Sequence, residues 1–506
     1  MNSEAAARLQ DHAPALRAIT GRDPRRFTPT DLGQAQRLVD EHGHDLRYVP
    51  GIGWHAWDGQ RFRPDIDGEV SRRAKRTAQD TLTAAAALGE ESERGRWVKF
   101  ALRCHDARRI EAAISLARTE AAIVTRADEL DTDPFLLNVE NGTLDLRTGE
   151  LRPHRREDLL TKLASARFEA SARSSRWDAF LAHATAGDVA LAAYLQRAAG
   201  YTLTGSTGEE VLPFVHGPAA SGKTTFVEAL KATLGDYSTT ADFASFLSRD
   251  HGVRNDLARL AGARMVAATE VAAGQRFDTA TLKALTGGDT ITARFLYREA
   301  FEFRPQFTLW LAGNDRPAID AHDSAAWRRL HAVPFTHTIP LAERDSALKR
   351  ALTEDPEELA AILAWAVEGC ARWQRGGLDA PPAVLAATSD YRAENDRLAD
   401  WLTSCCELRP DATTAGGLLR ARYERWATES GEDALNARDF ATALRAHGLT
   451  RKRTKRGATW TGITLAGDGV THGDGTSRES SPTRTRGQVS RGPVTTRHPS
   501  PAEATA

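Results

Sequence analysis

The chain has 506 residues, of which 41% are hydrophobic and 27% charged, and its formal net charge at pH 7 is −1. This length and composition indicate a globular protein of several domains and exclude a fibrous or wholly disordered chain. No apolar run has the length of a membrane span, the N-terminus lacks the layout of a signal peptide, and the four cysteines form no C-x-x-C pair. We therefore expect a cytoplasmic location, no membrane and no zinc ribbon or disulfide framework.

The first part of the chain is expected to be mostly helical. Residues 1–26 predict a flexible N-terminus and residues 27–205 an accessory domain. Aromatic and turn residues alternate over 48–63, which predicts a small hairpin, and charged, Ala-rich sequence predicts helices over 66–127.

The end of this accessory region has its own turn signals. The pairs Asn141-Gly142 and Thr148-Gly149 lie on either side of the short apolar run 143–146, which predicts a strand between two turns. Apolar residues at helical spacing predict a single helix over 177–203.

A G-x-x-x-x-G-K-[ST] motif occupies residues 217–224, between an apolar run and a helix-like segment. In this setting backbone N–H groups and a helix N-terminus surround phosphate groups. Lys223 supplies charge to the β- and γ-phosphates, and the Thr224 hydroxyl is placed to bind Mg²⁺. Only nine of the 67 basic residues are lysines, so a lysine in this loop is informative. The motif predicts a nucleoside triphosphate site formed by Gly217, Pro218, Ala219, Ala220, Ser221, Gly222, Lys223 and Thr224.

The segment 206–345 alternates strand-like and helix-like stretches, which predicts an α/β fold with a parallel sheet. An apolar strand over 265–269 ends in Glu270, and a carboxylate at such a strand end helps to hold Mg²⁺ or to polarise water. Because this is one acid rather than an Asp-Glu pair, either Glu270 serves both roles or a further acid assists. A second apolar strand ends in Asn314, whose amide can hydrogen-bond the γ-phosphate and the attacking water, although Gly-Asn-Asp is also an ordinary turn.

Basic residues lie between these two strands. Lys283 belongs to the segment Leu-Lys-Ala-Leu-Thr-Gly-Gly-Asp, and residues 291–303 predict a β-hairpin that carries Arg294 and has Arg298 near its tip.

Farther along the chain, Arg328 and Arg329 precede a predicted strand over 331–335. Either arginine is a candidate to reach the nucleotide of a neighbouring subunit and stabilise transition-state charge. An isolated arginine pair is otherwise an ordinary solvated surface.

The C-terminal part predicts three segments: helices over 346–410, a compact winged-helix unit over 411–465, and a disordered tail over 466–506 that has no Phe, Trp or Tyr. The compact unit shows two helices, the second capped by Asn436, then a basic turn and a strand. It predicts phosphate contacts, with a merely solubilising hairpin as the alternative. The residues concerned are Arg451, Lys452, Arg453, Lys455 and Arg456.

The ordered motifs resemble the superfamily 3 helicases, in the branch that contains poxvirus-type and phage/plasmid primase-helicases. The resemblance rests on Gly-Pro-Ala-Ala-Ser-Gly-Lys-Thr, Ala-Thr-Glu, Leu-Lys-Ala-Leu-Thr-Gly-Gly-Asp, Ala-Gly-Asn-Asp-Arg-Pro and Trp-Arg-Arg-Leu, in that order. Residues 137–149 and 195–205 also resemble the accessory region of that family. The resemblance covers roughly residues 30–465.

The resemblance implies an AAA+-like ring, usually a hexamer, that uses ATP and Mg²⁺ to move along single-stranded DNA and open forked DNA in phage, prophage or plasmid replication. It implies a bacterial host cytoplasm, with nucleoid association during replication. Its site residues would be Lys223 and Thr224 for nucleotide and Mg²⁺, Glu270 as acid, Asn314 as sensor, Arg328 or Arg329 as trans-acting finger, and Lys283, Arg294 and Arg298 at the DNA channel.

One departure from the family concerns primer synthesis. Larger members carry a primase domain with a strand-borne Asp-x-Asp metal site, but Asp131-Thr132-Asp133 precedes a proline, lies in no buried strand and has no accompanying zinc-binding cysteines. We therefore expect a separate primase or origin-binding partner.

Three other readings of the sequence stay open. The chain could be a primase-helicase that retains primer synthesis, or an ATP-regulated DNA-binding initiator without sustained unwinding. A small-substrate kinase would also need a phosphate loop, but it would leave the hairpin and the winged helix unexplained.

Overall fold

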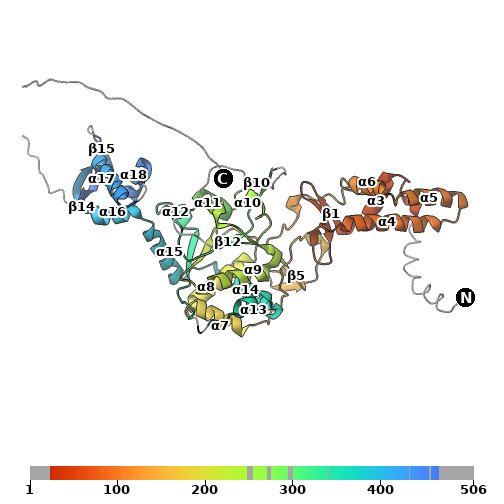
Figure 1. Ribbon diagram of the computed structural model, residues 1–506, viewed down its shortest axis with the longest axis horizontal. Helices are drawn as coiled ribbons and strands as arrows, with labels where there is room; N and C mark the ends of the chain where they lie inside the picture. The colour runs from red at the N-terminus through yellow and green to blue at the C-terminus, as the bar shows by residue number, and fades with distance from the viewer. Residues whose placement is uncertain are drawn as a thin grey trace, which may run out of the picture. The chain divides into compact units, whose positions relative to one another are not determined.

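The computed structural model describes residues 23–247, 255–269, 275–294, 300–340, 342, 344–431, 434–454 and 457–466. The chain divides into two compact units between Ala399 and Asp400 (Figure 1). Residues 1–22 and 467–506, which hold most of the predicted N-terminal segment and tail, lie outside the described residues. In the described part of the chain, no helix combines the length and the apolar character needed to cross a bilayer.

From residue 23 on, the described part of the first unit begins with four α-helices and a small antiparallel sheet. The predicted hairpin over 48–63 is a sheet of three strands, in which Arg47 pairs with His55 and Ala56 with Arg63. The helical prediction over 66–127 is confirmed by three successive helices. The elements are α3 (Asp31–His42), β1 (Leu46–Val49), β2 (Gly53–Trp57), β3 (Phe62–Pro64), α4 (Glu69–Ala86), α5 (Glu91–Arg103) and α6 (Ala107–Ala117).

A second antiparallel sheet and two helices follow. The predicted strand after Asn141 is confirmed as the middle strand of β4 (Leu136–Val139), β5 (Gly142–Asp145) and β6 (Glu150–Arg152). The prediction of one helix over 177–203 is wrong, because α7 (Ser175–Ala184) and α8 (Val189–Thr202) are separate. Ala186 and Gly187 between them have φ of 52° and 77°, and the Asp188 side chain caps α8. A left-handed pair followed by a capping aspartate ends one helix and starts another.

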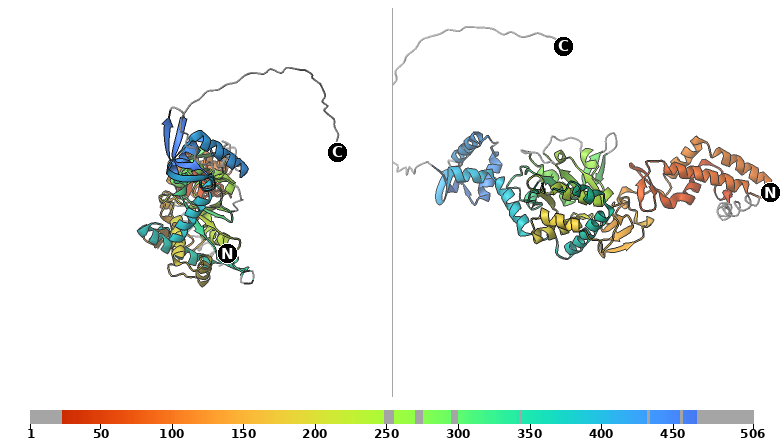
Figure 2. Two further views of the ribbon diagram at one scale, coloured as in Figure 1. Left: turned by 90° about the vertical axis from the view of Figure 1, so that its left-hand side faces the viewer. Right: turned by 60° about the horizontal axis from the view of Figure 1, so that its bottom comes forward.

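A five-stranded sheet forms the centre of the first unit (Figure 1 and Figure 2). Its strand order is β13-β7-β12-β9-β8 and all its neighbouring strands are parallel, which confirms the predicted α/β fold with a parallel sheet. The strands are β7 (Leu212–His216), β8 (Ser238–Thr240), β9 (Met265–Thr269), β12 (Thr308–Gly313) and β13 (Leu330–Pro334).

Helices cover both faces of this sheet, as the nearly continuous burial of β7 and β12 requires. Val215 and Trp310 face a core that includes α8, α9 and α14, whereas Phe214 and Leu311 face a core that includes α11 and α12. The helices are α9 (Lys223–Leu234), α10 (Asn255–Ala258), α11 (Thr279–Gly287), α12 (Ser324–Trp327), α13 (Leu348–Glu354), α14 (Pro356–Gly376) and α15 (Pro382–Glu394).

The backbones of helices α8 and α14 are in close contact at two glycines. A Cβ on Gly200 would lie 2.0 Å from the Cys370 backbone nitrogen, and one on Gly369 would lie 1.9 Å from the Gln196 carbonyl oxygen. The same core takes in Leu137 of the second small sheet. The later part of the predicted accessory domain therefore shares its core with the phosphate-loop segment.

The predicted β-hairpin is confirmed at its legs. The strands β10 (Ile291–Arg294) and β11 (Ala300–Phe303) pair antiparallel, with Ile291 opposite Phe303. Residues 295–299, which include Arg298 at the predicted tip, lie outside the described residues.

The second unit is a small helical and antiparallel fold. Its aromatic centre joins Trp401 of α16 to Tyr423 and Phe440, with ring centroids 5.5 Å apart for Trp401–Tyr423 and 4.8 Å apart for Tyr423–Phe440. The sheet order is β14-β16-β15. The elements are α16 (Arg397–Cys405), β14 (Cys406–Ala415), α17 (Gly416–Glu429), α18 (Ala437–Ala446), β15 (Thr450–Thr454) and β16 (Gly457–Leu465).

Candidate functional site

The phosphate-binding motif joins β7 to α9, as its sequence predicts. Gly217 has a φ of 149°, and a Cβ there would lie 2.0 Å from the Phe335 carbonyl oxygen. Gly222 has a φ of 90°, and a Cβ there would lie 2.9 Å from Cε2 of Phe180 in α7. Both positions therefore admit only glycine, and the loop presents backbone rather than side chains.

Lys223 is the first residue of α9 and is only 6% exposed. Its Nζ donates hydrogen bonds to the carbonyl oxygens of Gly217 at 2.8 Å and Pro218 at 2.6 Å, and to Ser221 Oγ at 3.2 Å. Burial lowers the pKa of Lys223. The ammonium group thus lies within the loop, on oxygens that phosphate oxygens could replace, and Thr224 beside it is exposed. A backbone cradle with a cation inside it fits a triphosphate.

The sheet brings two other predicted strand ends to the same edge. Gly313 at the end of β12 pairs with His216, the residue before the phosphate loop, and Ala312 pairs with Thr269 at the end of β9. Asn314 follows β12 directly and is exposed. Glu270, the residue after β9, lies outside the described residues, and its role stays a prediction.

Sequence reasoning did not single out Arg316, which lies at this edge too. Its Nη2 is 3.3 Å from His216 Nδ1, and its Nη1 donates to Glu394 Oε1 at 2.7 Å. Burial, followed by the charges of Arg316 and Lys223, lowers the pKa of His216 to about 4. The available signal was the position of this arginine in Ala-Gly-Asn-Asp-Arg-Pro, two residues after the predicted sensor.

The two candidate finger arginines have different surroundings. Arg328 has a side chain that is 64% exposed, and its Nη2 donates to Glu210 Oε2 at 2.9 Å. The Arg329 side chain is 8% exposed and donates to the same Glu210 oxygen at 2.7 Å and to the Ala325 carbonyl oxygen at 2.9 Å. Of the two, only Arg328 can move away from Glu210 without disturbing buried contacts.

The residues predicted to contact DNA in the channel are partly described. Lys283 is paired with Asp323 Oδ2 at 2.6 Å, and Asp323 also caps α12, the helix that precedes Arg328. Arg294 is exposed at the end of β10. Their roles at a channel, like that of Arg298, stay predictions.

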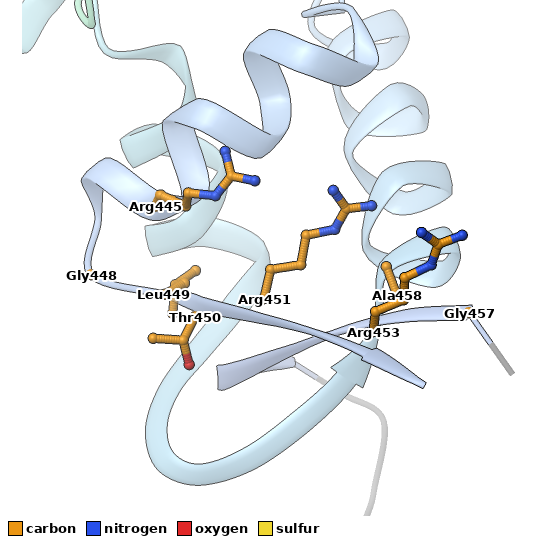
Figure 3. A pocket seen from close by; sticks show the side chains of 8 residues that line it. All are labelled: Arg445, Gly448, Leu449, Thr450, Arg451, Arg453, Gly457 and Ala458. Atoms are coloured by element: carbon orange, nitrogen blue, oxygen red, sulfur yellow. The ribbon is translucent and has the colours of Figure 1, made fainter. Parts of the chain in front are cut away.

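A basic groove of about 940 Å³ lies in the second unit. Arg445 of α18 lines it together with Arg451 and Arg453 of β15, and all three side chains are exposed. Figure 3 shows Arg451 and Arg453 rising from one face of β15, on the side where Arg445 lies. This follows from the alternation of side chains along a strand, which directs Lys452 to the other face. Lys455 and Arg456 lie outside the described residues, and sequence reasoning missed Arg445.

Comparisons with known proteins find similarity on both sides of the phosphate loop. A family model described as "D5 N terminal like" matches residues 35–185, and one described as "Family of unknown function (DUF5906)" matches residues 215–329. A protein of Acanthamoeba polyphaga mimivirus named as a helicase (L207/L206) is 28% identical over 316 residues, which are 58% of this chain and 33% of that protein. Helicase 022R of Frog virus 3 is 28% identical over 278 residues, which are 51% of this chain and 27% of that protein.

These matches support the resemblance of this chain to the phage-type superfamily 3 primase-helicases. The chain spans a third or less of the length of these two viral relatives. The solved apo structure of the NrS-1 C-terminal region has 10% identity and a TM-score of 0.46, over 87% of this chain and 98% of that one.

The two acids of the Asp131-Thr132-Asp133 segment are held apart from each other by separate contacts. The Asp131 carboxylate accepts from the Thr161 backbone nitrogen at 2.8 Å, whereas Asp133 pairs with Arg147 at 2.8 Å. Each acid is thus engaged by a different partner. Among the described residues, no group of three or more His, Cys, Asp or Glu side chains is placed to hold a metal ion.

Proposed function

We propose that this chain is an ATP-dependent DNA helicase of superfamily 3 whose first unit is an AAA+-like motor. It would work as a homohexameric ring on single-stranded and forked DNA in phage, prophage or plasmid replication. The observation that carries the proposal is the meeting of the phosphate loop, Asn314 and the end of β9 at one edge of the parallel sheet. The crevice outside the carboxyl ends of parallel strands is where α/β proteins bind nucleotides.

Each loop residue has a defined task in this proposal. When nucleotide binds, Lys223 Nζ donates to oxygens of the β- and γ-phosphates in place of the carbonyl oxygens of Gly217 and Pro218. The backbone of 217–222 surrounds the phosphate groups. The Thr224 hydroxyl and the Glu270 carboxylate would hold Mg²⁺, which neutralises charge on the transferring phosphoryl group. Asn314 orients the attacking water.

Arg328 is the better candidate for an arginine finger. A finger must reach into a neighbouring subunit, and the largely exposed Arg328 side chain is held by a single surface carboxylate. Arg329 is buried and bonded to the backbone of α12, so its role is to fix the segment that carries Arg328.

We further propose that the second unit is a winged helix that binds DNA phosphates. Its element order, three helices interleaved with a strand and ending in a two-stranded wing, matches that fold, and the sheet order places the third strand between the other two. Arg445, Arg451 and Arg453 gather positive charge along one groove, where sequence-independent phosphate contacts are the natural use.

The groove also fits the second candidate function, an initiator that binds DNA and uses ATP only for assembly. Unwinding separates the two. Wild-type protein with Mg²⁺-ATP should open a forked duplex, and Lys223→Ala should not open it while still binding the fork. Binding of the fork and of ATP without sustained turnover or unwinding would support the initiator and contradict the helicase.

A further inference from the structure

We propose that Arg316 binds the γ-phosphate of the nucleotide held in its own subunit, and that Glu394 holds this arginine when no triphosphate is present. This inference rests on the proposed ATP function, and it adds a sensing residue that acts in cis beside the trans-acting Arg328. It also gives the last turn of α15 a part in nucleotide sensing.

The position of Arg316 follows from strand register. Gly313 pairs with His216, so the chain that continues through Asn314 leaves the sheet beside the start of the phosphate loop. The guanidinium group has no acceptor atoms, so at 3.3 Å its Nη2 donates to His216 Nδ1. One cation therefore lies against the residue that precedes Gly217, while Lys223 occupies the loop itself.

The ion pair between Arg316 and Glu394 is easily broken. The Glu394 side chain is 57% exposed and the Arg316 side chain 24% exposed, and exposed ion pairs contribute little to stability. Phosphate oxygens carry more charge than one carboxylate and match the planar guanidinium group in geometry. The γ-phosphate of a bound triphosphate can therefore replace Glu394 as the partner of the Arg316 guanidinium group. A diphosphate has no γ-phosphate and cannot compete with Glu394.

The same loop is fastened to α15 at three further points. The Tyr391 hydroxyl donates to the Pro317 carbonyl oxygen, Asn395 Oδ1 accepts from the Ile319 nitrogen at 2.9 Å, and Arg392 Nε donates to the Ala321 carbonyl oxygen at 2.8 Å. These bonds do not involve the charge on Arg316. They hold the loop against the helix while the Arg316–Glu394 pair changes with the nucleotide.

A purely structural role for Arg316 makes a different prediction. If Arg316 only fastens the loop to α15, its loss lowers the melting temperature and affects ATP and ADP binding alike. If it binds the γ-phosphate, its loss weakens triphosphate binding selectively. Arg392→Ala is the matched control, because it removes an arginine from the same loop–helix contact without touching His216 or Glu394.

The experiment measures the Kd of the full chain for ADP and for a non-hydrolysable ATP analogue, both with Mg²⁺. Arg316→Ala should weaken analogue binding about tenfold or more, since a hydrogen bond to a charged group is lost, and change ADP binding by less than about twofold. Glu394→Gln should tighten analogue binding and leave ADP binding unchanged. Arg392→Ala should keep the wild-type ratio of the two constants.

Equal effects of Arg316→Ala on both nucleotides, or no effect on either, would overturn the inference. If Arg316→Ala does not fold, Glu394→Gln still tests the inference. Unchanged binding of the ATP analogue by Glu394→Gln would overturn the inference as well. A wild-type chain that binds neither nucleotide would overturn the proposed ATP function itself. Wild-type binding that Lys223→Ala abolishes, together with an unchanged Arg316→Ala ratio, removes only the inference.

Discussion

Two adjacent arginines, Arg328 and Arg329, differ in exposure and should therefore differ in function. Arg328→Ala should lower ATP turnover by about 10³-fold or more, the range seen for arginine fingers, without changing the melting temperature. Arg329→Ala should lower the melting temperature instead, because it removes a buried guanidinium bonded to Glu210 and to α12. Thermal denaturation and steady-state ATPase rates measure the two effects.

A mixing experiment tests whether Arg328 acts in trans. Rings mixed from Arg328→Ala and Lys223→Ala subunits should regain part of the ATPase activity, since some interfaces then pair an intact finger with an intact loop. Absence of any recovery over a range of ratios, with mixed assembly verified, would contradict a shared site.

His216 gives the first unit a pH-dependent stability. Because burial lowers its folded pKa to about 4, the unfolded chain takes up a proton near the ordinary pKa of about 6.5 while the folded chain does not. The free energy of unfolding therefore keeps its full value above about pH 6.5 and decreases as the pH falls toward 4. At pH 5 the decrease due to His216 is about 2 kcal/mol. Denaturant titrations at pH 7 and pH 5 should show a smaller loss for His216→Gln than for wild type. An equal loss would show that His216 is not the group responsible.

Sequence reasoning at this scale succeeded where spacing defines the chemistry. The motif at 217–224 predicted a strand, a loop and a helix, because its glycines and lysine have one use at that spacing. Arg316 and Arg445 had no such spacing to mark them. Each belongs to its site only because a strand register or a helix end places it there, which a pattern of arginines in an Arg-rich chain does not reveal.

The groove of the second unit makes a prediction at the scale of elements. Arg451→Ala and Arg453→Ala should each weaken DNA binding and reduce the slope of log K against log salt by about 1, as the loss of one phosphate contact requires. Lys452→Ala should have the smaller effect, because it lies on the other face of β15. Fluorescence anisotropy at several salt concentrations measures the slopes. Equal effects of all three substitutions would indicate a diffuse basic wing rather than a groove.

Element boundaries were predicted well where a local signal marks them. Asn436 caps α18 with its side chain, as expected, and the legs of the predicted hairpin pair with each other. The break between α7 and α8 was missed because apolar spacing continues across Gly187, whereas the backbone there is left-handed. The backbone conformation, and not the apolar pattern, ended the helix.

At the scale of the whole chain, the sequence suggested a boundary at 205/206, but one core joins Leu137 to Phe226 across it. A change in sequence composition therefore does not mark the limit of a hydrophobic core. The same reason explains why Trp401 belongs to the second unit although the winged-helix segment was expected from 411: its ring packs against Tyr423 and Phe440, a contact that the local sequence does not encode.

The central claim is that this chain couples ATP hydrolysis to DNA. The most direct test is the steady-state rate of ATP turnover with and without single-stranded DNA, for wild type and for Lys223→Ala. We predict a wild-type rate that rises severalfold with DNA and a variant that turns over no ATP in either condition. A wild-type rate that DNA does not change, or a variant that keeps the wild-type rate, would contradict the account.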